Sequence, residues 1–167
     1  MTGHATPHVV FVCWGNICRS PMAERAAQAM AREQGVKVEF SSAATTAEET
    51  GNPMDRRAAQ ALQRAGYRSD GHRAHQITAS EIRSADLVVA MEPVHLRQMR
   101  RIVPDAANLA LITDFDPAAP GTGIEDPWYG PASGFDATLA QIERALPGVL
   151  DWVRQRAPAT TPGPSAT

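Results

Sequence analysis

The stretch from Val9 to Pro21 reads VVFVCWGNICRSP, and it decides which fold the rest of the chain is expected to adopt. Its first four residues are apolar, as in a short strand buried on both faces of a sheet. Gly15 and Asn16 tolerate a positive φ at low cost, which indicates a tight loop. Ser20 and Pro21 suit the first turn of a helix. The stretch therefore predicts a strand, a tight loop and a helix in succession.

Two side chains of this stretch carry chemistry: Cys13 ends the predicted strand and Arg19 begins the predicted helix. The residues between them can curl so that backbone N–H groups and the helix N-terminus form a cradle for an anion. The same dipoles stabilise a thiolate on Cys13. The Arg19 guanidinium can bind two oxygens of a tetrahedral oxyanion at once. Together they indicate covalent phosphoryl transfer.

Three simpler interpretations of the loop are weaker. An isolated cysteine after a buried strand is usually a small core residue, but here the neighbouring residues all suit one loop. A metal site is hard to assemble from Cys13, Cys18, His4 and His8, so no metal is expected. A nucleotide-binding loop would continue with Gly-Lys and then Ser or Thr, which this chain lacks. No cofactor is expected.

The composition of the 167-residue chain suits one domain with one sizeable core. A net charge of −2 with scattered Lys and Arg gives no sign of nucleic-acid binding. No apolar run is long enough for a membrane span, and the N-terminus lacks a signal-peptide pattern. A thiolate nucleophile requires a reducing compartment, so we expect a cytoplasmic protein.

Strands and helices are predicted to alternate along residues 7–156, which predicts a single doubly wound α/β domain. Its parallel sheet carries helices on both faces and a site at the carboxyl ends of the strands. We expect a flexible N-terminus at 1–6, a disordered tail at 157–167, a functional loop at 116–134 and a kink or break at Pro147. Strands are expected at 9–12, 36–40, 86–91 and 109–112, and helices at 20–34, 55–64, 80–83, 93–101 and 135–153.

The opening motif resembles the signature of the low-molecular-weight protein tyrosine phosphatases, Val-Cys-x-Gly-Asn-x-Cys-Arg-Ser-Pro, which matches residues 12–21. The stretch EDPWYG at 125–130 is similar to the acid loop of that family. The resemblance extends over roughly 7–156, with shorter matches at 42–43, 55–58, 66–67, 72–74 and 115–117. It implies a four-stranded parallel sheet in the order 2-1-3-4 and hydrolysis of phosphotyrosine in proteins or peptides.

The resemblance also implies the roles of three residues. Cys13 attacks phosphorus to form a phosphocysteine, and Arg19 binds the equatorial oxygens. Asp126 protonates the leaving phenolate and then acts as a base on water. Composition alone does not choose between Asp126 and its neighbours Asp114 and Asp116. Inorganic phosphate or a similar oxyanion is expected against Trp14, Gly15, Asn16, Ile17, Cys18 and Arg19.

Further positions match supporting elements of the family. Cys18 is implied to trap oxidised Cys13 as a disulfide, unless it merely packs beneath the loop. The implied support network consists of Asn16, Ser20, Ser42 and His72, although a histidine in isolation is more often an ordinary surface or core residue. The implied wall around the substrate ring consists of Trp14, Glu48, Trp128 and Tyr129.

Three positions depart from the family pattern. Glu48 stands where many members carry tryptophan, His75 where arginine is common and Ala44 where glycine is usual. A carboxylate at position 48 offers no stacking and repels a phosphate dianion, unless it points into solvent. The same charge can favour peptides with Lys or Arg beside the phosphotyrosine.

Three other activities are compatible with this loop. An arsenate reductase on the same scaffold needs further thiols, and no cysteine follows Cys18. Protein arginine phosphatases typically carry threonine at the position of Ile17, where an apolar side chain favours an aryl phosphate. A catalytically silent phosphoprotein-binding module has no need for Cys13, Arg19 and Asp126 together. We therefore expect a protein tyrosine phosphatase that acts as a monomer or a weak dimer.

Overall fold

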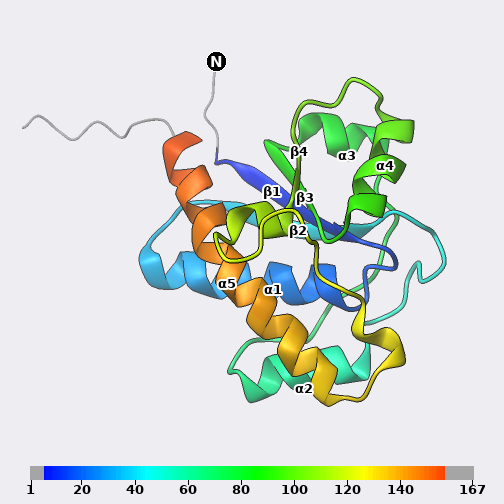
Figure 1. The fold of residues 1–167 in the computed structure, drawn as a ribbon, viewed down its shortest axis with the longest axis vertical. Coiled ribbons are helices and arrows are strands. Elements are labelled where there is room, and N and C mark those ends of the chain that lie inside the picture. Colours follow the sequence, from blue (N-terminus) through cyan, green and yellow to red (C-terminus); the bar gives the residue numbers. More distant parts are fainter. Residues whose placement is uncertain (1–5, 157–167) are drawn as a thin grey trace, which may run out of the picture.

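A parallel sheet of four strands lies at the centre of the computed structural model, which describes residues 6–156 (Figure 1). Its strand order is β2-β1-β3-β4, which confirms the predicted topology. The strands are β1 (His8–Cys13), β2 (Glu39–Ala44), β3 (Leu87–Ala90) and β4 (Leu109–Leu111). The expected loose N-terminus, apart from residue 6, and the expected tail at 157–167 lie outside the described residues, and the domain bounds stay a prediction.

Helices cover both faces of the sheet, which confirms the doubly wound α/β class (Figure 1). Successive side chains of β1 point to opposite faces. Val9 and Phe11 lie in the larger core with residues of α1, α2 and α5, whereas Val10 and Val12 lie in the smaller core with α3 and α4. The helices are α1 (Arg19–Gln34), α2 (Arg56–Arg64), α3 (Ala79–Ser84), α4 (Pro93–Ile102) and α5 (Ser133–Arg156), with 3-10 turns η1 (Ile112–Phe115) and η2 (Pro127–Tyr129).

Backbone hydrogen bonds beyond the strand ends bring a late part of the chain to the end of β1. The Met91 N–H donates to the Val12 carbonyl at 3.0 Å, and the Ile124 N–H donates to the Met91 carbonyl at 2.8 Å. Gly123 makes this approach possible, because its φ is +78° and a Cβ there would lie 3.0 Å from the Met91 oxygen. The loop that follows α4 and η1 therefore meets the Cys13 loop at one edge of the sheet.

Two elements differ from the sequence expectations. β2 was expected at 36–40 but spans Glu39–Ala44, because it pairs with β1 in register from His8 opposite Glu39 to Cys13 opposite Ala44. Hydrogen bonding to the neighbouring strand outweighs the short apolar alternation before it. The last helix is also not split, since α5 continues through Pro147.

The continuity of α5 follows from how tightly its middle is packed. Pro147 removes one helical hydrogen bond. Buried side chains on both sides of it, including Leu146 and Val149, compensate for this loss because they hold the helix in the core. A Cβ on Gly148 would lie only 2.5 Å from the Phe115 carbonyl oxygen, so glycine permits this close contact with η1.

Within residues 6–156 no helix has the length and apolarity needed to cross a bilayer.

Candidate active site

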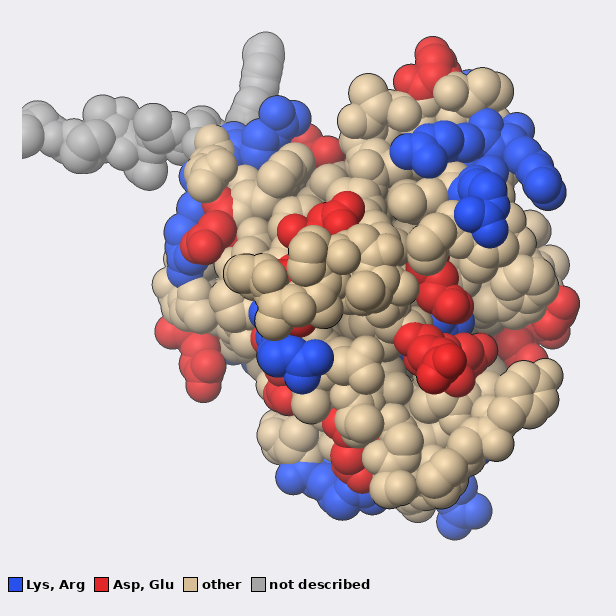
Figure 2. All heavy atoms as spheres, in the orientation of Figure 1, with Lys and Arg blue, Asp and Glu red and all other residues tan. Residues whose placement is uncertain are grey.

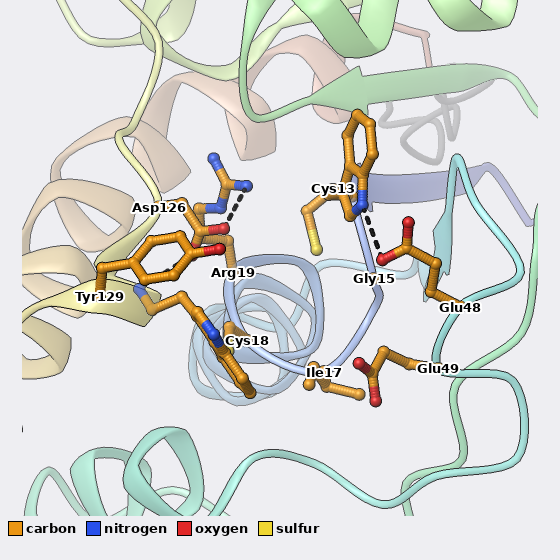
Figure 3. Close-up of a pocket in the computed structure, with 11 residues that line it drawn as sticks. Cys13, Gly15, Ile17, Cys18, Arg19, Glu48, Glu49, Asp126 and Tyr129 are labelled. Carbon is orange, nitrogen blue, oxygen red and sulfur yellow. Dashed lines mark hydrogen bonds and ion pairs between the residues drawn. The ribbon is translucent and has the colours of Figure 1, made fainter.

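One pocket opens at the carboxyl edge of the sheet, over the loop that joins β1 to α1 (Figure 3). It collects side chains from the loop after β2 and from the acid loop, which we define as residues 125–130. Its lining residues are Cys13, Trp14, Gly15, Ile17, Cys18, Arg19, Glu48, Glu49, Asp126, Trp128 and Tyr129. Most of the expected site residues therefore meet in one place, and Glu49 joins them unpredicted.

The Cys13 thiol lies at the base of this pocket and is almost fully buried. Its Sγ lies 3.0 Å from Ser20 Oγ, 3.3 Å from the Asn16 backbone nitrogen and 3.4 Å from the Ser20 backbone nitrogen. These three groups can all donate a hydrogen bond to a negative sulfur. The first turn of α1 adds its dipole in the same sense. The surroundings of Cys13 can therefore stabilise negative charge on the sulfur during catalysis.

The Asn16 side chain holds the loop in shape. Asn16 has a φ of +60° and is the only non-glycine among residues 6–156 with a positive φ. Its Nδ2 donates to Ser20 Oγ at 2.9 Å and to Ser42 Oγ at 3.0 Å, and its Oδ1 accepts from the His75 N–H at 3.1 Å. These bonds stabilise the unfavourable backbone conformation from three sides.

His72 completes this network from the loop before α3. Its Nε2 lies 2.6 Å from the Asn16 carbonyl oxygen, which can only accept, so Nε2 carries the proton. Burial lowers the pKa of His72, which keeps the ring neutral. The structure thus brings together Asn16, Ser20, Ser42 and His72, and it adds Glu24, which accepts from Ser42 Oγ. His75 takes part through its backbone only, while its ring contacts Glu81.

Arg19 is 2% exposed and is held by groups from two distant segments. Its Nη1 donates to Glu92 Oε1 at 2.5 Å and to the Ile124 carbonyl at 2.8 Å. Its Nη2 lies 3.5 Å from Asp126 Oδ2. Figure 3 marks this ion pair with a dashed line. The buried Nε has no hydrogen-bond partner within the described part of the chain. A buried, unpaired N–H beside a pocket is costly unless a ligand accepts from it, and an oxyanion would do so.

Asp126 is the one of the three candidate aspartates that lines the pocket. Its Oδ1 accepts from the Trp128 N–H at 3.0 Å, which caps η2 and leaves Oδ2 facing Arg19. Asp114 instead accepts from the Gly121 N–H at 2.9 Å. Asp116 is buried and pairs with Arg144 at 3.3 Å. Both of these aspartates stabilise the loop before Asp126 rather than the pocket.

Aromatic and acidic side chains form the rim of the pocket. The Trp14 indole N–H donates to Glu48 Oε1 at 3.2 Å, so the exposed Glu48 side chain is tied to the rim of the pocket. Trp128 and Tyr129 are 39% and 94% exposed on the opposite side. Of the residues that the structure describes, Arg19 is the only cation that lines the pocket. Figure 2 shows basic side chains gathered instead over α4, where Arg97, Arg100 and Arg101 are exposed.

Sequence reasoning missed Glu92 and His95, which lie behind Arg19. The Glu92 N–H donates to His95 Nδ1 at 3.1 Å, at the start of α4. A signal was present, because Glu92-Pro93 directly follows the strand predicted at 86–91 and Pro93 suits a helix start. Polar groups at that end of an inner strand belong to the edge where the site forms.

Across residues 6–156 no cluster of His, Cys, Asp and Glu is arranged to hold a metal ion.

We expect His95 to make the fold sensitive to mild acid. Burial, with a smaller effect of nearby Arg19, lowers the pKa of His95 from 6.5 to about 3. Between pH 7 and pH 5 the unfolded chain therefore gains a proton at this histidine while the folded chain does not. The free energy of unfolding therefore decreases as the pH is lowered from 7 to 5, by about 2 kcal/mol from His95 alone.

Urea unfolding of the wild type and of His95→Gln at pH 7 and pH 5 measures this contribution. For each protein, the free energy of unfolding at pH 5 is subtracted from that at pH 7. This difference should be larger in the wild type than in His95→Gln, by about 2 kcal/mol. His72 also has a lowered pKa and acts in the same direction, but it is present in both proteins and cancels. An equal loss in the two proteins would show that His95 titrates normally.

The chain matches the family model described as low molecular weight phosphotyrosine protein phosphatase over residues 8–159. It is 45% identical over 154 residues to low molecular weight protein-tyrosine phosphatase A of Mycobacterium tuberculosis, covering 89% of this chain and 93% of that protein. It is 34% identical over 157 residues to the human low molecular weight phosphotyrosine protein phosphatase, covering 90% of this chain and 98% of that protein.

Two solved structures are similar across nearly their whole length. YfkJ from Bacillus subtilis matches with a TM-score of 0.86 and 25% identity, covering 93% of this chain and 99% of that one. The YwlE arginine phosphatase, in a mutant form with a phosphorylated active-site serine, matches with a TM-score of 0.81 and 25% identity, covering 89% of this chain and 97% of that one.

Proposed function

We propose that this chain, which belongs to the low molecular weight phosphotyrosine protein phosphatase family, hydrolyses phosphotyrosine in proteins through a phosphocysteine on Cys13. One observation carries the proposal. The Cys13 sulfur, the unpaired Arg19 Nε and the Asp126 carboxylate all belong to one pocket at the carboxyl edge of the sheet. This arrangement supplies a nucleophile, an oxyanion site and an acid to the same substrate.

In the first step the Cys13 thiolate attacks phosphorus in line, so that a sulfur–phosphorus bond forms as the bond to the phenolic oxygen breaks. Arg19 binds the equatorial oxygens together with backbone N–H groups of residues 14–18. Asp126 gives its proton to the departing phenolate. In the second step the Asp126 carboxylate takes a proton from water, which attacks phosphorus and releases inorganic phosphate and the thiolate. No metal or cofactor takes part in these steps.

The walls of the pocket support an aromatic phosphate ester as substrate. Trp14 lies on one side of the opening, and Trp128 and Tyr129 lie on the other, where they can contact a phenyl ring. Ile17 adds an apolar surface to the lining. Because the exposed charge at the rim is acidic, with Glu48 on one side, peptides with Lys or Arg next to the phosphotyrosine are favoured. The pocket is built by one chain, which supports activity as a monomer.

Kinetics on three substrates test the proposal. Purified protein should turn over a phosphotyrosine peptide at least about tenfold more efficiently than phosphoarginine, because Trp14, Trp128 and Tyr129 can stack on a phenyl ring that phosphoarginine lacks. Arsenate should not be reduced, since Cys13 and Cys18 are the only cysteines and no thiol pair remains to complete a relay. Greater efficiency on phosphoarginine, despite Ile17, would instead indicate the arginine phosphatase activity named for YwlE.

We also propose that Cys18 protects Cys13 from permanent oxidation, in a reducing compartment such as the cytoplasm. Both cysteines are free and buried. Burial, followed by the charge of Asp55, raises the pKa of the Cys18 thiol, which therefore stays protonated. When peroxide oxidises the Cys13 thiolate to a sulfenic acid, the Cys18 thiol can condense with it, forming a disulfide and releasing water.

The protein treated with peroxide should therefore regain most of its activity when a reducing thiol is added. Cys18→Ser should regain only a small part, because its sulfenic acid proceeds to the irreversible sulfinic acid. Intact mass before reduction provides a second readout, since the disulfide lowers the mass and the sulfinic acid raises it. Equal recovery and equal mass changes on peroxide treatment in the two proteins would contradict this protective role.

A further inference from the structure

Arg57 of α2 joins the phosphate loop, which we define as residues 13–19, to the acid loop, although Arg57 does not line the pocket. At the phosphate loop, the Asp55 N–H donates to the Ile17 carbonyl at 2.8 Å. The Asp55 carboxylate in turn accepts from Arg57 Nε and Arg57 Nη2, each at 3.2 Å. Asp55 also caps the first turn of α2, so the position of the guanidinium is fixed relative to the loop that holds the oxyanion.

The other edge of the same guanidinium binds the acid loop. Arg57 Nη1 donates to the Trp128 carbonyl at 3.0 Å. Arg57 Cζ lies over the Trp128 ring, 5.0 Å from its centroid, and over the Phe135 ring, 4.4 Å from its centroid. Trp128 is in turn bonded to the catalytic candidate, because its N–H donates to Asp126 Oδ1 at 3.0 Å. A chain of direct contacts therefore leads from Ile17 through Arg57 to Asp126.

We infer that Arg57 is a positioning residue that holds the acid loop against the phosphate loop, so that Asp126 reaches the leaving oxygen. The acid loop has few other attachments: Trp128 is 39% exposed, Tyr129 is 94% exposed, and Asp126 touches Arg19 only at 3.5 Å. Arginine suits this position because its planar fork can bind a carboxylate, donate to a carbonyl and stack on rings at the same time. Lysine could do only one of these things at once.

This inference rests on the proposed role of Asp126 as the general acid, and it predicts a loss that depends on the leaving group. The measured quantity is kcat/KM, which reports the steps up to phosphorylation of Cys13. Arg57→Met keeps the length of the side chain and removes the guanidinium. It should lower kcat/KM about tenfold for a phosphotyrosine peptide, because small displacements of a catalytic group are costly. It should change kcat/KM little for a dinitrophenyl phosphate, whose leaving group departs without a proton.

Arg64→Met is the matched control. Arg64 lies at the contact of α2 with α5, where it forms an exposed pair with both carboxylate oxygens of Asp136 at 2.9 and 3.0 Å. It contacts no residue of the acid loop in the described chain, so both substrates should behave as in the wild type. The ratio of the two kcat/KM values does not depend on how much of each variant is folded, so partial unfolding cannot imitate the expected result.

The double variant Arg57→Met/Asp126→Asn distinguishes a wrong role for Arg57 from a wrong role for Asp126. In the Asp126→Asn background the Arg57→Met change should have no further effect on the phosphotyrosine peptide, because the group that it positions is already lost. Equal losses for both substrates, or a further tenfold loss in the Asp126→Asn background, would overturn the positioning role of Arg57. If Asp126→Asn itself left both substrates unchanged, the proposed acid would be wrong, whatever Arg57 does.

Discussion

Replacing Cys13 by serine is expected to abolish turnover of every phosphate ester, lowering kcat by about 10⁵-fold or more, as loss of a nucleophile commonly does. The three donors around Sγ stabilise an anion, and a thiol gives up its proton far more readily than a serine hydroxyl. The serine oxygen would stay protonated and would not attack phosphorus. Rapid mixing with an aryl phosphate should therefore show no burst of phenol.

Binding provides the control for this variant. The loop N–H groups and Arg19 are unchanged in Cys13→Ser, so the protein should still bind a phosphotyrosine peptide, which calorimetry can measure. Retained binding with no turnover separates loss of the nucleophile from collapse of the loop. A Cys13→Ser protein with a rate within about tenfold of the wild type would rule out covalent catalysis by Cys13.

Replacing Asp126 by asparagine is expected to have the second largest effect, a loss of about 10²–10⁴-fold in kcat/KM for a phosphotyrosine peptide. Asparagine can still accept from the Trp128 N–H, so the shape of η2 is kept while the transferable proton is lost. The loss should be much smaller for a dinitrophenyl phosphate.

Asp114→Asn is the matched control for that substitution. Asp114 lies in the same region of the chain but accepts from Gly121 and does not line the pocket, so activity should be nearly unchanged. A loss in Asp114→Asn as large as that in Asp126→Asn would mean that the two substitutions act through the shape of the loop. An equal loss for both leaving groups in Asp126→Asn would argue against proton donation.

Local patterns were sufficient to predict the centre of this fold. The buried strand, the Gly15-Asn16 turn and the helix start follow one another in sequence, so short-range preferences specify the phosphate loop. The observed φ of Asn16 is the one that the loop was expected to need. Alternation of strands and helices led to the parallel sheet, because few other arrangements bury both faces of such strands.

Long-range contacts were the part that local patterns could not supply. β2 was misplaced because its ends are set by pairing with β1 rather than by its own residues. Only the resemblance to a family identified Asp126, and not Asp114 or Asp116, as the acid. All three lie beside turn residues, so their local sequences do not distinguish them. Glu92 and Arg57 went unnoticed because a single charged residue at a helix start is ordinary until the fold shows what it contacts.

The topology also sets the order in which the site can form during synthesis. The phosphate loop comes from the beginning of the chain, whereas the acid loop and α5 come from its end. α5 contributes side chains such as Phe135, Leu146 and Val153 to the same core as Phe11 and Met22. Until α5 is synthesised, α1 and α2 alone cover this face of the sheet, and the acid loop lacks the helix that follows it. We therefore expect phosphatase activity to appear only after α5 has packed against this face of the sheet.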